Sequence, residues 1–280
     1  MDLPRLSGYL WAEGFIMVFL SRACVLLAVL GMLLLGSANA QPVLDRVRTA
    51  GALKVCIWPE YYGVTYRHPR TQELSGIDIE LAAALATDLN VRVEYVDSSF
   101  PTLVSDLVED RCDVAMFAVG VTAQRAEKLR FTQPYLRSDI YGITTKSNQV
   151  VREWSDIDKP GVLVAVQSGT FMEPVMEQRL KHAQLVRVKL PATRERELVA
   201  GRVDVFMTDY PYSRRLLDNA DWARLIAPPE PFSVLPYAYA VKPGDAQWLA
   251  VVDEFVSRIK KDGRLNNAAS KHGLGPIVVR

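Results

Sequence analysis

An arginine and an aspartate each follow one copy of a repeated segment, and together they supply the two charges that a small zwitterion needs. Residues 111–116 (Arg-Cys-Asp-Val-Ala-Met) recur as residues 202–207 (Arg-Val-Asp-Val-Phe-Met). Arg125 follows the first copy and Asp209 follows the second. A guanidinium can hold a carboxylate through two parallel hydrogen bonds, and a carboxylate can accept protons from an ammonium group. We therefore expect a cleft between two similar lobes that binds a molecule carrying both groups.

Simpler roles compete with this interpretation. Arg125 can be a solvated helix charge, Asp209 can be the N-cap of a helix that starts near Tyr212, and Thr170 can be a helix cap. Aromatic residues gather at the predicted cleft, at Trp58, Tyr61, Tyr62, Phe100, Phe117 and Phe171. Most of them can equally be core or hinge packing, and for Phe117 core packing is the preferred interpretation.

The elements that must position these residues alternate between strands and helices in both halves of the chain. The apolar pattern predicts strands at 53–57, 91–96 and 113–118, with helices at 77–89 and 100–109. The second half repeats this order, with strands at 162–166, 185–190 and 203–207 and helices at 173–180, 193–200 and 212–219. This order predicts an α/β fold in which each lobe is a doubly wound, mostly parallel sheet. Ligands bind at the carboxyl ends of such strands, where Trp58, Phe100 and residues 118–125 fall.

Two extended segments are expected to join the lobes. Residues 139–145 and 237–241 are rich in β-branched or aromatic residues and poor in glycine. Placing the crossings there assigns residues 41–138 and 239–280 to lobe 1 and residues 139–238 to lobe 2. Two crossing strands form a hinge rather than a flexible tether.

The N-terminus has the pattern of a secretory signal peptide. Residues 24–36 are almost wholly apolar, a positive charge precedes them, and residues 38–40 supply an Ala-x-Ala cleavage site. A membrane-spanning helix needs about 20 apolar residues, so this run is short for an anchor. We expect residues 1–40 to be removed, with a retained anchor as the less favoured alternative and Met17 as an alternative start. The mature protein is then periplasmic or secreted.

Cys56 and Cys112 remain after this cleavage. They lie on strands that would be neighbours in the predicted sheet, so an oxidising compartment permits a disulfide between them. Two small buried apolar residues fit the pattern equally well. No His or Cys pair has the spacing of a metal site, and no metal or cofactor is expected. A net charge of +1 with scattered positive residues argues against a nucleic-acid partner.

Six segments in order resemble the family 3 solute-binding proteins, the periplasmic amino-acid receptors of ABC importers. They are residues 53–55 with the aromatic loop that follows, 76–82, 113–125, 131–135, 167–170 and 204–209. The resemblance covers essentially the whole mature chain. It implies a two-lobed periplasmic-binding-protein fold of type II, joined by two hinge strands. It also implies a monomer that delivers a zwitterionic or carboxylate ligand to a membrane ABC permease.

The resemblance also implies roles for single residues. Arg125 lies where the family grips the α-carboxylate of the ligand, and Asp209 lies where it takes the α-ammonium. Backbone and hydroxyl groups near Gly169 and Thr170 would add donors for the carboxylate. The remaining binding residues are expected to be Gly120, through its backbone N–H, and the aromatic residues Trp58, Tyr61, Phe100 and Phe171, of which Tyr61 and Phe100 fall where the family stacks the ligand side chain.

Some positions depart from the family pattern. Ala118 and Gly120 stand where many amino-acid receptors carry serines, and Phe171 stands where a small hydroxyl residue is common. These changes predict a drier pocket, and they put in doubt that the ligand is a standard polar amino acid.

Two alternatives to capture remain. Residues 44–46, 134–137 and 207–209 are also similar to cyclohexadienyl (arogenate/prephenate) dehydratases, whose glutamate lies three residues after the aspartate. Tyr212 stands there instead and is a poor general acid, because a tyrosine pKa lies near 10. Glu173 is near the cleft but is expected to face away on its helix. A periplasmic accessory module that recognises a protein partner is the other alternative, and capture is the favoured function.

Overall fold

The computed structural model describes residues 41–280. The predicted signal peptide, its cleavage site and the alternative start at Met17 all lie outside these residues. Within residues 41–280, no helix combines the length and the apolar character needed to cross a membrane.

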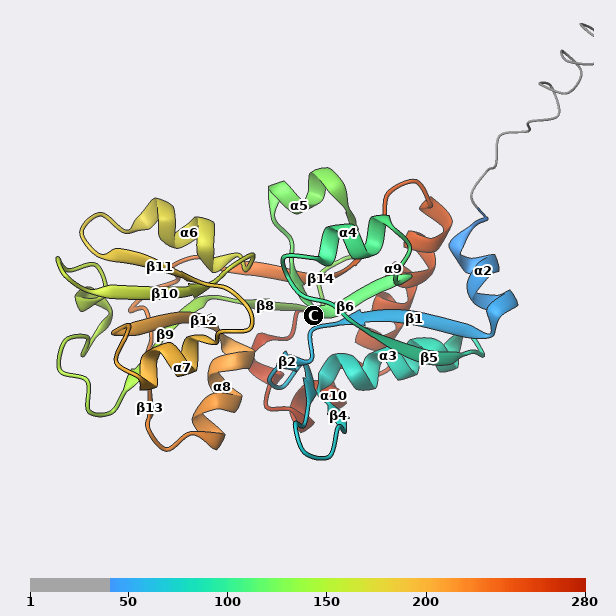
Figure 1. Ribbon diagram of the computed structural model, residues 1–280. Coiled ribbons are helices and arrows are strands. Elements are labelled where there is room, and N and C mark those ends of the chain that lie inside the picture. Colours follow the sequence, from blue (N-terminus) through green and yellow to red (C-terminus); the bar gives the residue numbers. More distant parts are fainter. Residues whose placement is uncertain (1–40) are drawn as a thin grey trace, which may run out of the picture. The chain divides into compact units, whose positions relative to one another are not determined.

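The first lobe is built on a sheet with the strand order β5-β1-β6-β14-β7, and β8 pairs with β14 (Figure 1). β1 runs parallel to β5 and β6, whereas β14 is antiparallel to β6. The strands are β1 (Ala52–Ile57), β5 (Arg92–Asp97), β6 (Val114–Gly120), β7 (Arg130–Phe131), β8 (Leu136–Ser138) and β14 (Leu235–Val241). The helices of this lobe are α2 (Val43–Ala50), α3 (Ile77–Asp88), α4 (Leu103–Val108), α5 (Ala123–Lys128), α9 (Ala246–Lys261) and α10 (Arg264–Lys271), followed by the short helix η2 (Gly275–Ile277).

The second lobe repeats the plan with the strand order β11-β10-β12-β9-β13. β10 runs parallel to β11 and β12, and β9 is antiparallel to β12. The strands are β9 (Ile140–Thr145), β10 (Leu163–Gln167), β11 (Gln184–Val188), β12 (Val205–Asp209) and β13 (Ala223–Ile226). The helices are η1 (Trp154–Asp156), α6 (Met172–Arg179), α7 (Arg194–Val199) and α8 (Tyr210–Asn219).

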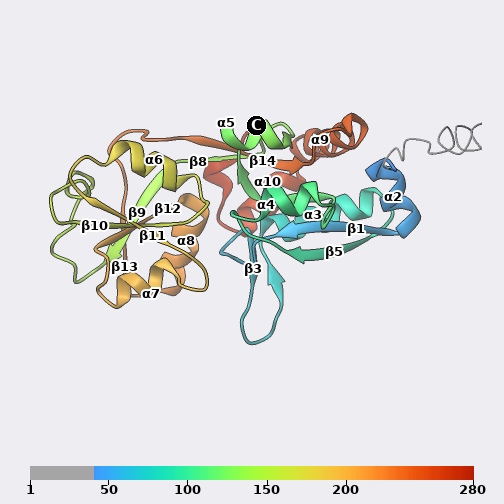
Figure 2. The same cartoon turned by 45° about the horizontal axis from the view of Figure 1, so that its top comes forward.

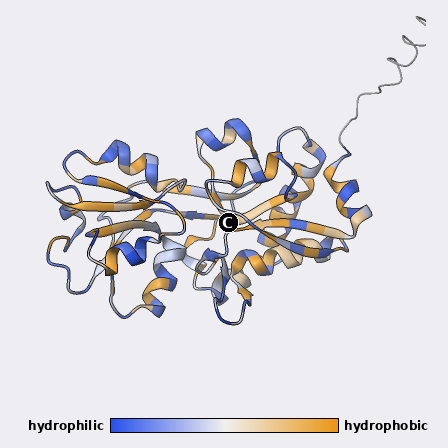
Figure 3. Cartoon of the chain, in the orientation of Figure 1, coloured by the Kyte–Doolittle hydropathy of each residue, from blue (hydrophilic) through white to orange (hydrophobic). Residues whose placement is uncertain are grey.

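The repeated segment makes the same local contact in both lobes. The Asp113 carboxylate accepts the backbone N–H of Lys54, and the Asp204 carboxylate accepts that of Leu163, both at 2.8 Å. The strands that follow, β6 and β12, are buried at every residue, and Figure 3 shows apolar colouring along the central strands of both sheets. Each aspartate therefore joins the start of a buried central strand to its parallel neighbour.

A small third sheet was not predicted from the sequence. Its strands are β2 (Glu60–Tyr61), β3 (Thr65–Arg67) and β4 (Leu74–Ser75), and Figure 2 shows it projecting from the side of β1 and β5. Strands of two or three residues are too short to establish an alternating pattern. Its first strand nevertheless places Tyr61 at the end of β1, where the cleft was predicted.

The segments predicted to link the lobes are strands, but each belongs to one sheet. Residues 140–145 form β9 in the second sheet, and β14 already belongs to the first sheet from Leu235 onward. β-branched and aromatic content identifies a strand without saying which sheet it joins. The first crossing lies at Asp139, where the first predicted segment begins and lobe 2 was predicted to start. The second crossing lies between residues 226 and 235, before the predicted segment 237–241. The Asp139 carboxylate accepts the backbone N–H groups of Phe232 and Ser233 at 2.8 and 2.7 Å, which ties the two crossings together.

Cys56 and Cys112 form a disulfide, which resolves the alternative that the sequence left open. Cys56 lies in β1, and Cys112 lies two residues before β6, so the bond joins neighbouring strands of the first sheet. Within residues 41–280, no group of His, Cys, Asp and Glu is arranged to hold a metal ion.

Candidate functional site

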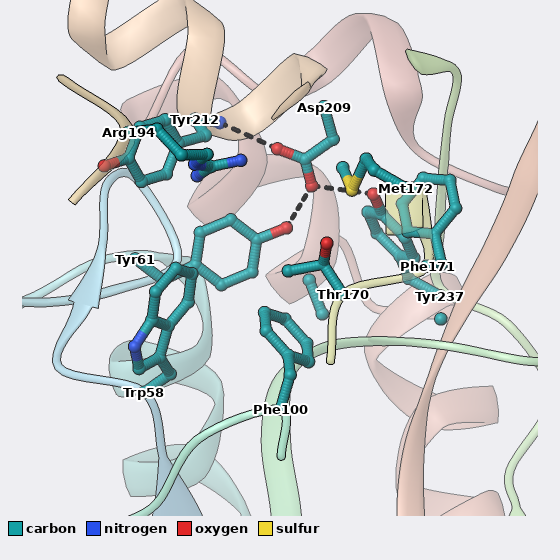
Figure 4. Close-up of a pocket in the computed structure, with 12 residues that line it drawn as sticks. Trp58, Tyr61, Phe100, Thr170, Phe171, Met172, Arg194, Asp209, Tyr212 and Tyr237 are labelled. Atoms are coloured by element: carbon teal, nitrogen blue, oxygen red, sulfur yellow. Dashed lines mark hydrogen bonds between the residues drawn. The ribbon is translucent and has the colours of Figure 1, made fainter. Parts of the chain in front are cut away.

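A pocket lies where the carboxyl ends of the central strands of both sheets meet (Figure 4). Its cavity is only about 20 Å³, close to the space that one water molecule needs. The lobes are therefore closed over the pocket, and its own side chains fill most of it. The residues that line it are Trp58, Tyr61, Phe100, Ala118, Gly120, Thr170, Phe171, Met172, Arg194, Asp209, Tyr212 and Tyr237.

Arg125, on α5, is not among the residues that line this pocket, but it lies beside it and contacts the lining residues Gly120 and Phe100. Its side chain is 8% exposed, and its guanidinium donates to the carbonyl oxygens of Gly120 and Gly169, each at 3.0 Å. The guanidinium also lies 5.2 Å from the centre of the Phe100 ring. Burial lowers the pKa of Arg125 to about 10, so it remains charged at neutral pH. Arg125 is thus a buried cation rather than the solvated helix charge that the sequence allowed. Two neutral carbonyl oxygens accept hydrogen bonds from its guanidinium.

Asp209 is the last residue of β12 and the N-cap of α8. One carboxylate oxygen accepts the backbone N–H of Tyr212 at 3.2 Å. The other accepts the hydroxyl of Tyr237 at 2.7 Å and the hydroxyl of Tyr61. Asp209 is 2% exposed, and burial raises its pKa, although the tyrosine hydrogen bonds oppose that shift. Asp209 is therefore both the helix cap and a charge at the pocket, so the two sequence interpretations are compatible.

Each of these two charges is bonded to the opposite lobe. Arg125, in the first lobe, donates to Gly169 in the second, and Asp209, in the second, accepts from Tyr61 and Tyr237 in the first. These hydrogen bonds occupy the directions that a carboxylate and an ammonium would use. A ligand with both groups must therefore exchange the interlobe hydrogen bonds for its own.

The aromatic residues divide into two groups. Trp58 lies with its ring centre 5.2 Å from those of Tyr61 and Phe100 and is nearly parallel to Tyr212 at 6.3 Å. Together with Phe171 these residues line the pocket. Phe117 is fully buried behind Phe100 and does not line it. Tyr62 packs on Tyr66 of the small sheet, outside the lining.

The hydrogen-bond donors that were predicted to hold a ligand at the start of α6 already donate to other groups of the second lobe. The Thr170 hydroxyl donates to the carbonyl of Gln167 at 2.7 Å, and the backbone N–H of Gly169 donates to Glu173 at 2.8 Å. Gly169 has a φ of +81°, and a Cβ there would lie 2.9 Å from Pro101, so only glycine fits. Glu173 is also paired with Arg187 at 2.9 Å and does not line the pocket. Gly169 and Thr170 thus lie at the cleft, but their polar groups need rearrangement before they can hold a ligand.

Arg194 and Tyr237 line the pocket and were not predicted from the sequence. Arg194 is the first residue of α7, a helix that the apolar pattern did predict. A charged residue at the start of a helix, near the carboxyl edge of the sheet, was the signal that could have identified it as a site residue. Tyr237 was assigned to a linker instead. Arg194 is 3% exposed and donates to the carbonyl of Met207 at 2.7 Å. Its guanidinium lies 4.7 Å from the centre of the Tyr212 ring.

Tyr212 stands where a related enzyme would carry an acid. Its hydroxyl donates to Glu195 at 2.7 Å. Burial raises the pKa of Tyr212 well above its usual value. A phenol held in this way keeps its proton at neutral pH, and it is poorly suited to protonate a leaving group.

Comparison with known proteins identifies the family to which this chain is similar. The model of the bacterial extracellular solute-binding proteins, family 3, matches residues 53–275. The chain is 30% identical over 243 residues to a cyclohexadienyl dehydratase of Pseudomonas aeruginosa, covering 85% of this chain and 89% of that protein. It is 25% identical over 238 residues to the L-cystine-binding protein TcyJ of Escherichia coli, covering 85% of this chain and 88% of that protein.

Solved structures confirm the predicted two-lobed type II periplasmic-binding-protein fold. The ancestral amino acid-binding protein AncCDT-1, a precursor of cyclohexadienyl dehydratase, has a TM-score of 0.74 at 28% identity, covering 81% of this chain and 98% of that chain. An amino acid ABC transporter substrate-binding protein of Streptococcus pneumoniae, bound to L-arginine, has a TM-score of 0.73 at 22% identity, covering 83% of this chain and 98% of that chain. The family resemblance predicted from the sequence is also confirmed. The chain belongs to the bacterial extracellular solute-binding proteins of family 3.

Proposed function

We propose that this protein captures an amino acid or a related small carboxylate in the pocket between its lobes and delivers it to an ABC importer. The observation that carries the proposal is that the buried carboxylate of Asp209 lines a closed pocket and the buried guanidinium of Arg125 lies beside it, each bonded to the opposite lobe. The L-cystine-binding and glutamine-binding relatives support a solute-binding role. The signal peptide predicted from the sequence supports a periplasmic location, where such a receptor would work.

Capture proceeds by opening, exchange and closure. Opening breaks the hydrogen bonds of Arg125 to Gly169 and of Asp209 to Tyr61 and Tyr237. The ligand carboxylate then takes the Arg125 fork, and its ammonium takes Asp209. Closure excludes water and strengthens both contacts, because charges interact more strongly where the dielectric constant is low. The ligand stabilises the closed form to the extent that it binds that form better than the open one.

A dehydratase is the second candidate, because a cyclohexadienyl dehydratase is 30% identical to this chain. That reaction needs a general acid near the leaving group. Asp209 is the only carboxylate among the residues found to line the pocket, and three protein donors hold it. Tyr212 is bonded to Glu195 and keeps its proton. The pocket therefore favours binding over catalysis.

Thermal-shift and calorimetric titration of residues 41–280 against amino acids, prephenate, arogenate and small carboxylates test both candidates. A ligand at about 100 times its dissociation constant stabilises the folded state by about 2.7 kcal/mol, which gives a clear shift in Tm. Absence of a shift with every zwitterion and carboxylate would reject capture. Turnover of prephenate or arogenate would replace capture by catalysis.

A further inference from the structure

The charges at the pocket are unbalanced. The charged residues among those that line it are Arg194 and Asp209. Arg125 adds a second guanidinium, because it contacts two of the lining residues, Gly120 and Phe100. Two buried arginines thus face one buried carboxylate.

Arg194 has few partners for a buried guanidinium. It is 3% exposed, and the acceptor found for it within residues 41–280 is the carbonyl of Met207. No ion pair of those residues includes it. The rings of Tyr212 and Phe206 lie 4.7 and 5.2 Å from its carbon centre. A guanidinium has five N–H donors, and a buried charge is costly unless it is paired and hydrogen-bonded.

The unused donors of Arg194 are directed into the pocket. Figure 4 places its nitrogen atoms beside the Tyr212 ring, on the side of Asp209 and Tyr61. Asp209 does not pair with Arg194 directly, because its oxygens accept from Tyr61, Tyr237 and the backbone of Tyr212. An anionic group on the ligand would give Arg194 the countercharge and the hydrogen-bond acceptors for its remaining N–H groups.

A cationic side chain fits this pocket poorly. Asp209 is the single acid among the lining residues, and the α-ammonium of an amino acid is proposed to take it. A second positive group on the ligand would face Arg194 without a further carboxylate among the lining residues to offset it.

We propose that the pocket selects a small dicarboxylate, with one carboxylate on Arg125 and the second on Arg194, and that Arg194 is the residue that determines this selectivity. This inference rests on the proposed function and names its ligand class. The rings of Trp58 and Phe100 line the pocket, so an apolar or unsaturated spacer suits the ligand. An amino dicarboxylate and an amine-free dicarboxylate share this chemistry and differ only in their use of Asp209.

Calorimetry with matched ligand pairs tests the proposal on residues 41–280. The pairs are glutamate with glutamine and aspartate with asparagine. Glutarate and fumarate represent dicarboxylates without an amine, and arginine represents ligands with a cationic side chain. We expect a dicarboxylate to bind at least about tenfold more tightly than its monoamide, because a charge-assisted hydrogen bond is worth that much. Arginine should bind more weakly than either. Tighter binding of glutarate or fumarate than of glutamate would identify the amine-free class.

Arg194→Gln removes the charge but keeps a donor for Met207. It should abolish the preference for the dicarboxylate while leaving the affinity for the monoamide within about threefold. Retained monoamide binding shows that the variant is folded. Arg194→Lys should restore part of the preference. Arg196→Gln, on the exposed face of α7, is the matched control and should change nothing.

Two results would overturn the proposal while leaving the proposed function intact. One is equal affinity of the wild-type protein for a dicarboxylate and its monoamide. The other is an equal loss of both affinities in Arg194→Gln, which would make Arg194 a positioning residue for Asp209. Absence of binding for every carboxylate would reject the proposed function as well.

Discussion

Two buried aspartates in this protein have the same kind of partners but different surroundings. Asp78, at the start of α3, accepts hydrogen bonds from the hydroxyls of Tyr135 and Tyr239 at 2.5 and 3.1 Å and from the backbone N–H of Ala118 at 2.9 Å. Asp209 likewise accepts from two tyrosine hydroxyls and one backbone N–H. Both carboxylates are almost completely buried. The difference lies in which lobe supplies the tyrosines.

All the partners of Asp78 belong to the first lobe, so its hydrogen bonds persist when the lobes separate. The tyrosines of Asp209 belong to the opposite lobe, so opening breaks those hydrogen bonds and a ligand can replace them. We propose that a buried carboxylate is thus a permanent structural centre in one place and an exchangeable contact in the other. Similar local chemistry acquires a different role from its position relative to the hinge.

The largest expected effect is on stability, from Asp78→Ala. The substitution leaves three buried donors without an acceptor, and each costs about 1–3 kcal/mol. We expect the free energy of unfolding to fall by at least about 3 kcal/mol, measured by urea denaturation. Ligand affinity of the folded fraction should remain unchanged. A small loss of stability would mean that the Asp78 centre is dispensable.

Replacement of Asp209, the other buried carboxylate, by alanine should weaken ligand binding. Asp209→Ala removes the proposed partner of the ligand ammonium, and loss of a buried, hydrogen-bonded charge pair costs about 2–5 kcal/mol of affinity. We expect an amine-bearing ligand to bind at least about 30-fold more weakly in calorimetry. The loss of stability should be smaller than in Asp78→Ala, because the freed hydroxyls of Tyr61 and Tyr237 become hydrated when the lobes open. Retained affinity would refute the assignment of Asp209.

The Asp78 centre should also be visible as a pH dependence. Burial raises the pKa of Asp78 to about 6, although its hydrogen bonds oppose the shift. Between its ordinary pKa of 3.8 and that value, the folded protein retains a proton that the unfolded chain has lost. The free energy of unfolding therefore falls as pH rises through this window, by at most about 1.4 kcal/mol per unit, and does not change further above it.

Urea unfolding of the wild-type protein and Asp78→Asn at pH 4, 5, 6 and 7 measures this contribution. Ion-paired carboxylates such as Asp88 have lowered pKa values and give the opposite slope, but they do so in both proteins and cancel in the difference. We expect the stability of the wild type relative to the variant to decline from pH 4 to pH 6. A relative increase would contradict the raised pKa.

The scaffold of both lobes could be predicted from the sequence because it depends on local patterns. Continuous apolar strands such as β6 and β12, alternating with helices, specify a parallel sheet, and the repeat specifies two of them. The second crossing was predicted at residues 237–241 but lies before Leu235, because strand content does not reveal which sheet β14 joins. The hairpins of the small sheet escaped prediction because their strands are too short to have a pattern.

The site was predictable where a residue lies at the end of a predicted strand. Arg125 and Asp209 met this criterion; Asp209 lines the pocket, and Arg125 contacts the lining residue Gly120. Arg194 lies instead at the start of a predicted helix and contacts residues of its own lobe, and the place of Tyr237 in the pocket depends on how the lobes close. The hydrogen bonds of Asp209 to Tyr61 and Tyr237 join residues far apart in the sequence, and no local pattern encodes such a contact.

The smallest expected effect is a gain in affinity from the double substitution Tyr61→Phe and Tyr237→Phe. Both rings remain, but the unliganded closed form loses the two hydroxyl bonds to Asp209. A larger fraction of the protein is then open to a ligand, and the apparent dissociation constant falls in inverse proportion to that fraction. We expect an amine-bearing ligand to bind up to about tenfold more tightly in calorimetry, because two interlobe hydrogen bonds no longer compete with it.

The matched control is Tyr135→Phe with Tyr239→Phe at the Asp78 centre. It removes the same two groups from an equivalent carboxylate, and we expect it to lower the free energy of unfolding without changing affinity. The fluorescence of Trp58 reports separately on the cleft, because this indole stacks near Tyr212 of the other lobe. Its emission in the unliganded protein should shift in the Tyr61→Phe, Tyr237→Phe variant and not in the control. Weaker binding in the cleft variant would mean that the hydroxyls of Tyr61 and Tyr237 hold the ligand or orient Asp209, rather than compete for it.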